Sequence, residues 1–143
     1  MWQRIQTLYL GISTALMIAL FFCKFATILG PEGAEEIIRY YEKTPYLVLM
    51  IMTLTAHICS IGSFKLRMLQ ARVCIITALL ALGMQVWFVM DFLQFRHDMV
   101  FSISMVFPLV MTILDVLAAR ASMVDEMTIA AVRGVRKARR RRQ

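Results

Sequence analysis

The chain has 143 residues, of which 60% are hydrophobic and only 17% charged, and its mean hydropathy is +0.70. This composition excludes an ordinary soluble domain and is typical of a chain whose apolar surface faces lipid as well as neighbouring helices. The formal net charge is +7, and much of it lies in a short C-terminal segment. One small membrane domain is therefore expected.

Four apolar stretches are each long enough to cross a bilayer. A spanning helix needs about 20 mostly apolar residues because the hydrocarbon core is about 30 Å thick. We therefore predict an all-α fold, a four-helix transmembrane bundle over residues 1–120, in which Pro108 kinks the last span. The predicted spans cover approximately residues 8–29, 45–64, 73–92 and 101–119.

The connection between the first two predicted spans has recognisable boundaries. Gly30 and Pro31 stop the first span, because glycine tolerates the left-handed conformation after a helix and proline cannot continue one. Thr44 and Pro45 open the second, since proline loses nothing at the first helical position. Residues 33–43 mix charged and apolar side chains, which favours a short interfacial helix at the outer face of the membrane.

The distribution of basic residues predicts the orientation of the spans. Lys and Arg near span ends resist translocation, whereas acidic residues count for little. Arg4, the connection that holds Arg67 and Arg72, and the C-terminal tail all fall on one side. The other side carries fewer basic residues, diluted by acidic ones. Both termini are therefore expected to be cytoplasmic, an N-in/C-in arrangement.

Asp115 is the most informative polar residue predicted to lie in the membrane. A carboxylate inside a span is costly unless it is paired, protonated or hydrated. Arg120 is turned about 140° away around the helix, so it is a poor partner. Arg4, Arg67 or Arg72 could reach Asp115 from the same membrane face. The interpretations are a proton or ion site and a structural clamp, and we favour the clamp because a single shallow carboxylate lacks the acidic relay usual in pumps.

His57 in the second span and Gln85 in the third are the other notable intramembrane polar residues. Both are expected to form hydrogen bonds between helices. The only other histidine, His97, belongs to the outer connection, so a metal or haem site lacks a second ligand. The sequence also lacks a Cys-x-x-Cys pair, a phosphate-binding glycine loop and a nucleophile elbow. We therefore expect no cofactor and no enzymatic activity.

Residues 121–143 form the second predicted unit, a basic cytoplasmic tail. Ser122 and Asp125 have the spacing of a capping box, which predicts a new helix after Arg120. The simplest interpretation is an orientation signal that rests on anionic lipid head groups. The sharper one is a ribosomal RNA contact, since clustered arginines bind phosphates. The residues predicted to contact lipid or phosphate are Arg133, Arg136, Lys137, Arg139, Arg140, Arg141 and Arg142.

Both ends of the chain resemble a known family. The opening Met1-Trp-Gln-Arg-Ile-Gln-Thr-Leu-Tyr-Leu10 resembles the Met-x-Gln-Arg-Ile-Gln-Thr-x-Tyr-Leu start of small four-span membrane proteins of Bacteroidota, catalogued as a domain of unknown function. The segment Leu117 to Glu126 is similar to that family's Leu-Ala-x-Arg-Ala-x-x-x-Asp-Glu, with Ala119 in place of the usual asparagine. The resemblance implies the four-span topology and a bacterial cytoplasmic (inner) membrane location, but no activity.

These two ends share one membrane face by the charge argument, which predicts a polar cluster on that face. Arg4 can pair with Asp125 or Glu126, and the glutamines can satisfy the remaining hydrogen-bonding groups. The predicted members are Gln3, Arg4, Gln6, Asp115, Arg120, Asp125 and Glu126.

We interpret the chain as a small non-enzymatic integral membrane protein, an accessory or scaffold subunit. Its expected partners are the lipid bilayer, anionic head groups contacted by the basic tail, and a membrane-protein partner or further copies of the chain. Two alternatives stay open. One is a small oligomeric transporter or channel with a polar path near Asp115, and the other is a ribosome or nucleic-acid tether through the Arg-rich tail.

Overall fold

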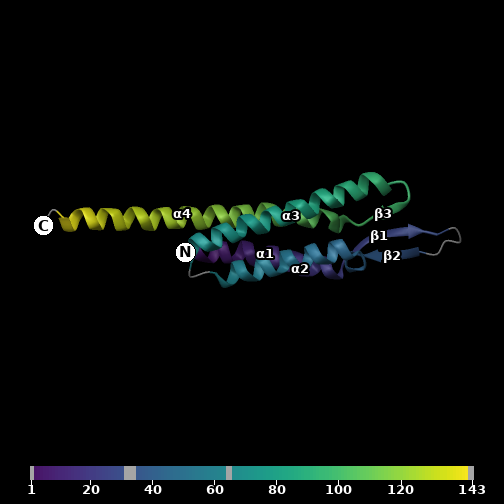
Figure 1. The fold of residues 1–143 in the computed structure, drawn as a ribbon, viewed down its shortest axis with the longest axis horizontal. Helices are drawn as coiled ribbons and strands as arrows, with labels where there is room; N and C mark the ends of the chain where they lie inside the picture. Colours follow the sequence, from purple (N-terminus) through teal and green to yellow (C-terminus); the bar gives the residue numbers. More distant parts are fainter. Residues whose placement is uncertain (1, 31–34, 64–65, 142–143) are drawn as a thin grey trace.

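The computed structural model describes residues 2–30, 35–63 and 66–141, which form four long helices and a small sheet (Figure 1). The start of α1 and the end of α4 lie towards one end of the molecule, and the sheet lies at the other. Helix α4 packs against α1 and α3, and α2 packs against the same two helices. The helices are α1 Trp2–Phe22, α2 Thr44–Gly62, α3 Arg67–Phe95 and α4 Phe107–Arg141.

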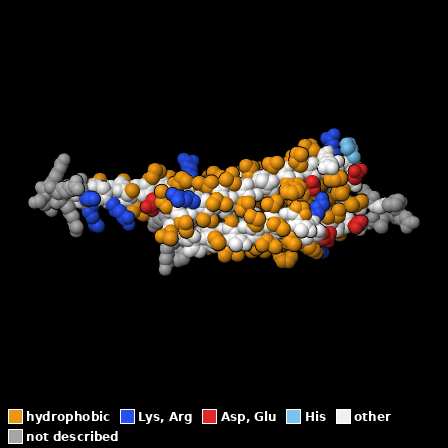
Figure 2. Space-filling model, in the orientation of Figure 1, with side chains coloured by type: hydrophobic (Ala, Val, Ile, Leu, Met, Phe, Trp, Pro, Cys, Tyr) orange, Lys and Arg blue, Asp and Glu red, His pale blue; other side chains and the backbone are white. Residues whose placement is uncertain are grey.

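All four helices are long and apolar enough to cross a membrane. Figure 2 shows apolar side chains over most of the visible bundle surface, with charged side chains towards its two ends. A helix satisfies its backbone hydrogen bonds internally, which is what a lipid-exposed segment requires. Four helices therefore have the length and composition needed to cross a membrane, which is the predicted number.

The first helix ends earlier than predicted. We expected a span over residues 8–29, but α1 ends at Phe22, and Lys24–Leu29 form strand β1. Lys24 interrupts the apolar run at this point, and the residues after it bond to two other strands. Phe25 and Ala26 are buried in the core beside the sheet, which explains why apolar residues continue after the end of the helix.

The predicted interfacial helix over residues 33–43 is wrong. Within the described residues of that range, Glu35–Arg39 form strand β2, and Tyr40–Glu42 form a 3-10 turn, η1. Strand β2 pairs antiparallel with β1, so the backbone groups of the hairpin bond to each other. The β-branched residues Ile37 and Ile38 fit a pleated strand better than a helix.

A third strand completes the sheet. Strand β3, Met99–Phe101, pairs antiparallel with the other edge of β1, which gives the order β2-β1-β3. A second 3-10 turn, η2 Ile103–Val106, then leads into α4. The predicted all-α class therefore holds for the four long helices, while a three-stranded sheet covers one end of the bundle.

The fourth helix is continuous from Phe107 to Arg141, which corrects two expectations. Pro108 is the second residue of α4, where its missing N–H would be unpaired in any case, so it starts the helix instead of kinking it. The Ser122 hydroxyl donates to the Ala118 carbonyl at 3.0 Å, one turn back in the same helix. Ser122 is therefore an internal residue of α4, and the predicted helix start after Arg120 is wrong.

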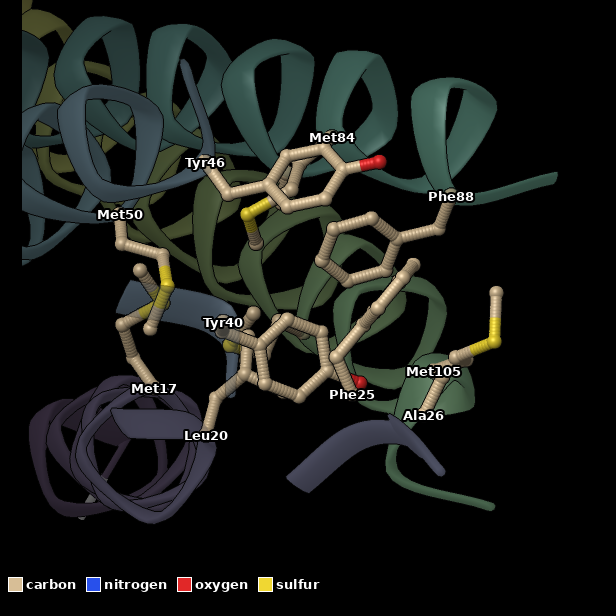
Figure 3. Close-up of a cluster of buried hydrophobic side chains, with 12 residues drawn as sticks. Met17, Leu20, Phe25, Ala26, Tyr40, Tyr46, Met50, Met84, Phe88 and Met105 are labelled. Carbon is tan, nitrogen blue, oxygen red and sulfur yellow. The ribbon is translucent and has the colours of Figure 1, made fainter. Parts of the chain in front are cut away.

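The interior has an apolar part beside the sheet and a more polar part further away. Figure 3 shows the apolar part, where methionine and aromatic side chains pack together. The ring centroid of Phe25 lies 5.3 Å from that of Tyr40 and 5.9 Å from that of Phe88. The other part combines a small apolar cluster around Leu10 and Cys74 with buried polar side chains.

Candidate functional site

A buried polar cluster joins α1, α2 and α4 inside the bundle. The Ser13 hydroxyl lies 2.7 Å from His57 Nε2. An Asp115 carboxyl oxygen lies 3.3 Å from the same nitrogen. All three side chains are fully buried. Since burying an ionisable group is costly unless it is paired, these three residues are the strongest candidate for a site inside the bundle.

Hydrogen bonding fixes one proton on His57. Its Nδ1 lies 2.9 Å from the Thr53 carbonyl oxygen, which can only accept, so Nδ1 carries a hydrogen. The other ring nitrogen, Nε2, faces both Ser13 and Asp115. If the ring is neutral and the carboxyl group is ionised, the lone pair of Nε2 faces the negative charge of Asp115, which is unfavourable. An added proton on Nε2 or on the carboxyl group makes the contact attractive. Nε2 is therefore the atom at which Ser13 and Asp115 both meet the imidazole ring.

Further buried polar groups lie around this cluster. Ser60 Oγ on α2 and Cys74 Sγ on α3 are 2.9 Å apart. Gln6 and Gln70 are also buried. Within the described residues, neither Asp115 oxygen has a hydrogen-bond partner that meets normal geometry. The ion-pair contact with His57 is thus the main interaction that the structure gives this carboxyl group.

The structure places the members of the predicted polar cluster in different surroundings. Asp115 is fully buried inside the bundle and lies beside His57. Gln6 is buried and Arg120 is exposed. Asp125 and Glu126 are half-buried. The side chains of Gln3 and Arg4 lie outside the part that the structure describes.

Gln85 joins α3 to the start of α4. Its side-chain oxygen accepts a hydrogen bond of 3.1 Å from the Leu109 backbone N–H. Leu109 is in the first turn of α4, where backbone N–H groups have no partner within the helix. Gln85 therefore satisfies a free donor across the helix interface, and both it and His57 connect helices as expected.

An ionic cluster beside the sheet was not predicted. Lys43 Nζ lies 2.9 Å from an Asp91 carboxyl oxygen, and the Tyr46 hydroxyl donates to the same oxygen. The ammonium group also lies 4.7 Å from the Phe25 ring centroid, within cation–π range. Lys43 precedes α2, and Asp91 lies near the end of α3. The sequence signal for this pair was that Lys43 and Asp91 have opposite charges and lie near the same membrane face in the predicted topology.

Tyr40 belongs to a second hydrogen-bonded group beside the sheet. Ser104 Oγ donates to the Lys24 carbonyl at 3.1 Å, so the Tyr40 hydroxyl, 2.9 Å away, is the donor to Ser104. These bonds connect η1, β1 and η2. Burial disfavours the tyrosinate and raises the pKa of Tyr40 to about 12.

Basic side chains gather where α1 begins and where α4 extends past the other helices, here called the basic end (Figures 1 and 2). The exposed ones among the described side chains include Arg72, Arg120, Arg133, Arg136 and Lys137. The side chains of residues 139–142 lie outside the described part. A groove of about 620 Å³ lies between the start of α3 and α4, and its polar lining residues are Arg72, Glu126 and Arg133.

These features define a small four-helix protein with helices suited to a membrane and a three-stranded sheet at one end. The model of a family described as a domain of unknown function, DUF4293, matches residues 2–133, and the chain belongs to this family. The resemblance to a family of unknown function is thereby confirmed. No curated protein and no solved structure matches the chain.

Proposed function

We propose that this chain is a multi-pass protein of the bacterial cytoplasmic membrane and acts as a non-enzymatic accessory or scaffold subunit. The four apolar helices support the membrane location. Exposed Arg72 and Arg120 support an orientation with both termini in the cytoplasm, because basic residues near span ends stay on that side.

The continuous helix α4 is the observation that carries this proposal. From Arg120 to Arg141 the helix rises about 32 Å at 1.5 Å per residue. Its last part, residues 130–141, is here called the arm. Arg133, Arg136 and Lys137 are exposed on the arm at spacings fixed by the helix. A helix that holds several cations in fixed positions is suited to an anionic partner.

The arm's partner is either an anionic lipid surface or an acidic face of another protein. Near an anionic bilayer each basic residue adds about 1 kcal/mol of binding free energy. Arginine can also bind carboxylates and phosphates through two parallel hydrogen bonds. Both partners would hold the bundle at a defined place, which is what an accessory or scaffold subunit requires.

The test compares proteins purified from native membranes in mild detergent. One variant replaces three exposed basic residues of the arm by Gln: Arg133, Arg136 and Lys137. A matched control replaces three exposed basic residues beside the sheet by Gln: Lys24, Arg39 and Arg96. We expect the wild type and the control to retain a protein or an anionic lipid that the arm variant loses.

Three results are informative in this experiment. Equal recovery of every accompanying molecule by all three proteins would contradict a binding role for the arm. Loss of the same molecule from both variants would indicate an effect of net charge alone. RNA as the one component lost from the arm variant would make the chain a nucleic-acid tether.

A small oligomeric transporter is the second candidate, and the buried pair of His57 and Asp115 favours it. Buried ionisable residues often mark proton or ion paths in membrane proteins. Apolar side chains fill the core beside the sheet (Figure 3), so a proton path to that end of the bundle requires surfaces from several copies. Liposomes with wild-type protein would then show proton flux that Asp115→Asn abolishes, and flux no higher than in empty liposomes would exclude proton transport.

A further inference from the structure

A second groove runs between α3 and α4 and has an almost entirely apolar lining. Its volume is about 500 Å³. Ala78 and Ala119 are buried, whereas Leu79, Leu82 and Val116 are exposed. The two small residues leave space between larger neighbours, which produces a hollow on the surface that the apolar helices offer to lipid.

Arg120 is the one charged residue among the described residues that line this groove. Its side chain is exposed, and no described carboxylate lies within ion-pair distance of it. Arg120 lies one turn beyond Val116 towards the basic end. From Thr112, which also lines the groove, α4 rises about 12 Å to Arg120. This distance is close to the thickness of one leaflet of the hydrocarbon core, about 15 Å.

We propose that this groove binds an anionic phospholipid, with its phosphate at Arg120 and an acyl chain along Leu79, Leu82 and Val116. The inference rests on the proposed membrane location but not on the proposed role of the arm. Lipid is the occupant because the exposed lining residues Leu79, Leu82 and Val116 belong to two helices that are apolar enough to cross a membrane. Guanidinium pairs well with the phosphate of either head group, but the ammonium group of phosphatidylcholine is repelled by Arg120, so the site prefers a head group with a net negative charge.

Native mass spectrometry in mild detergent tests this site. The full chain is titrated with phosphatidylglycerol or with phosphatidylcholine of the same acyl chains. We expect the wild type to retain phosphatidylglycerol preferentially and Arg120→Gln to lose about tenfold in its affinity, the effect of about one charge-assisted hydrogen bond. Arg72→Gln is the matched control, because Arg72 is exposed at the same end but lines the other groove.

A second variant tests the apolar part of the groove. Val116 is 52% exposed, so Val116→Trp fills the hollow without disturbing the core. It should lower the retention of both lipids to a similar extent, whereas Arg120→Gln should lower that of phosphatidylglycerol more and reduce the preference for it over phosphatidylcholine. Circular dichroism and gel filtration of both variants check that they are folded and monodisperse.

Several results would overturn the proposal. One is that the wild type retains the two lipids equally. Another is that Arg120→Gln and Arg72→Gln lose the same amount of affinity for phosphatidylglycerol. A third is that Val116→Trp retains both lipids as well as the wild type does. A dimer that Val116→Trp dissociates, with no bound lipid, would instead assign the groove to a second copy. The arm variant with three Gln residues should keep its lipid, so failure of the arm proposal is separable from failure of this one.

Discussion

His57 and Asp115 hold ionisable groups where apolar side chains would be easier to bury. Removing one partner from a buried pair costs about 3–5 kcal/mol, whereas replacing both by apolar residues of similar size is often neutral or stabilising. We therefore expect His57→Leu and Asp115→Leu each to lower the free energy of unfolding by about 3 kcal/mol, and the double variant to lie near the wild type. Unfolding in mixed detergent micelles measures this.

Ser13→Ala serves as the control in that series. It removes one hydrogen bond to His57 but leaves the pair with Asp115, so its cost should be near the average for hydrogen bonds between membrane helices, about 0.6 kcal/mol. Losses that simply add in the double variant would show that His57 and Asp115 do not stabilise the bundle as a unit.

Tyr40 makes the packing beside the sheet sensitive to alkali. Its pKa is raised from the ordinary value of 10.0 to about 12, so the folded protein keeps the phenol proton that the unfolded chain loses. This contribution to stability is complete below pH 10 and is lost as the pH rises towards 12. A titration followed by tyrosinate absorbance should show a late transition near pH 12 that is missing in Tyr40→Phe. An unchanged curve in that variant would contradict the assignment.

At the scale of elements, α4 should behave as one rigid rod. Ile113 and Lys137 are both exposed and are 24 residues apart, which corresponds to about 36 Å along a continuous helix. Spin labels on cysteines at these positions, in a background without native cysteines, should give a narrow distance distribution near that value. Ala130→Pro should broaden and shorten it. A broad distribution before that change would mean that the arm is not helical.

The long helices could be predicted because hydropathy reports directly on a length of about 20 apolar residues. Thr44 and Pro45 also located the start of α2 correctly. Strand β1 could not be found in this way, since its apolar residues extend the run of α1 and hydropathy does not separate a buried strand from a helix. Its conformation depends on pairing with distant residues, such as Ala26 with Phe101.

The polar residues of the site could be identified in the sequence, but their partners could not. His57 and Asp115 stand out as polar residues in apolar runs. Which of them meet depends on the rotation of each helix and on its position along its neighbours, and hydropathy reports neither. The expected partners were arginines at a membrane face, whereas the structure supplies a histidine from a neighbouring helix.

At the scale of the whole molecule, the proposed orientation predicts two separate accessibilities. Glu36 in β2 and Arg136 in the arm are exposed at opposite ends. In a background without native cysteines, Glu36→Cys should react with a membrane-impermeant maleimide from outside the cytoplasmic membrane. Arg136→Cys should react only after lysis. Labelling of both from the same side would contradict the proposed topology.

Because α4 is unbroken, Asp115 and the arm rotate together about one axis. A turn of the helix that draws Asp115 away from His57 also redirects Arg133 and Arg136 through the same angle. A partner that holds the arm in one direction therefore favours one state of the buried pair, and the pair favours one direction of the arm by the same free energy. With the proposed partner bound to the arm, the helix would couple the contact between His57 and Asp115 to an electrostatic contact outside the core.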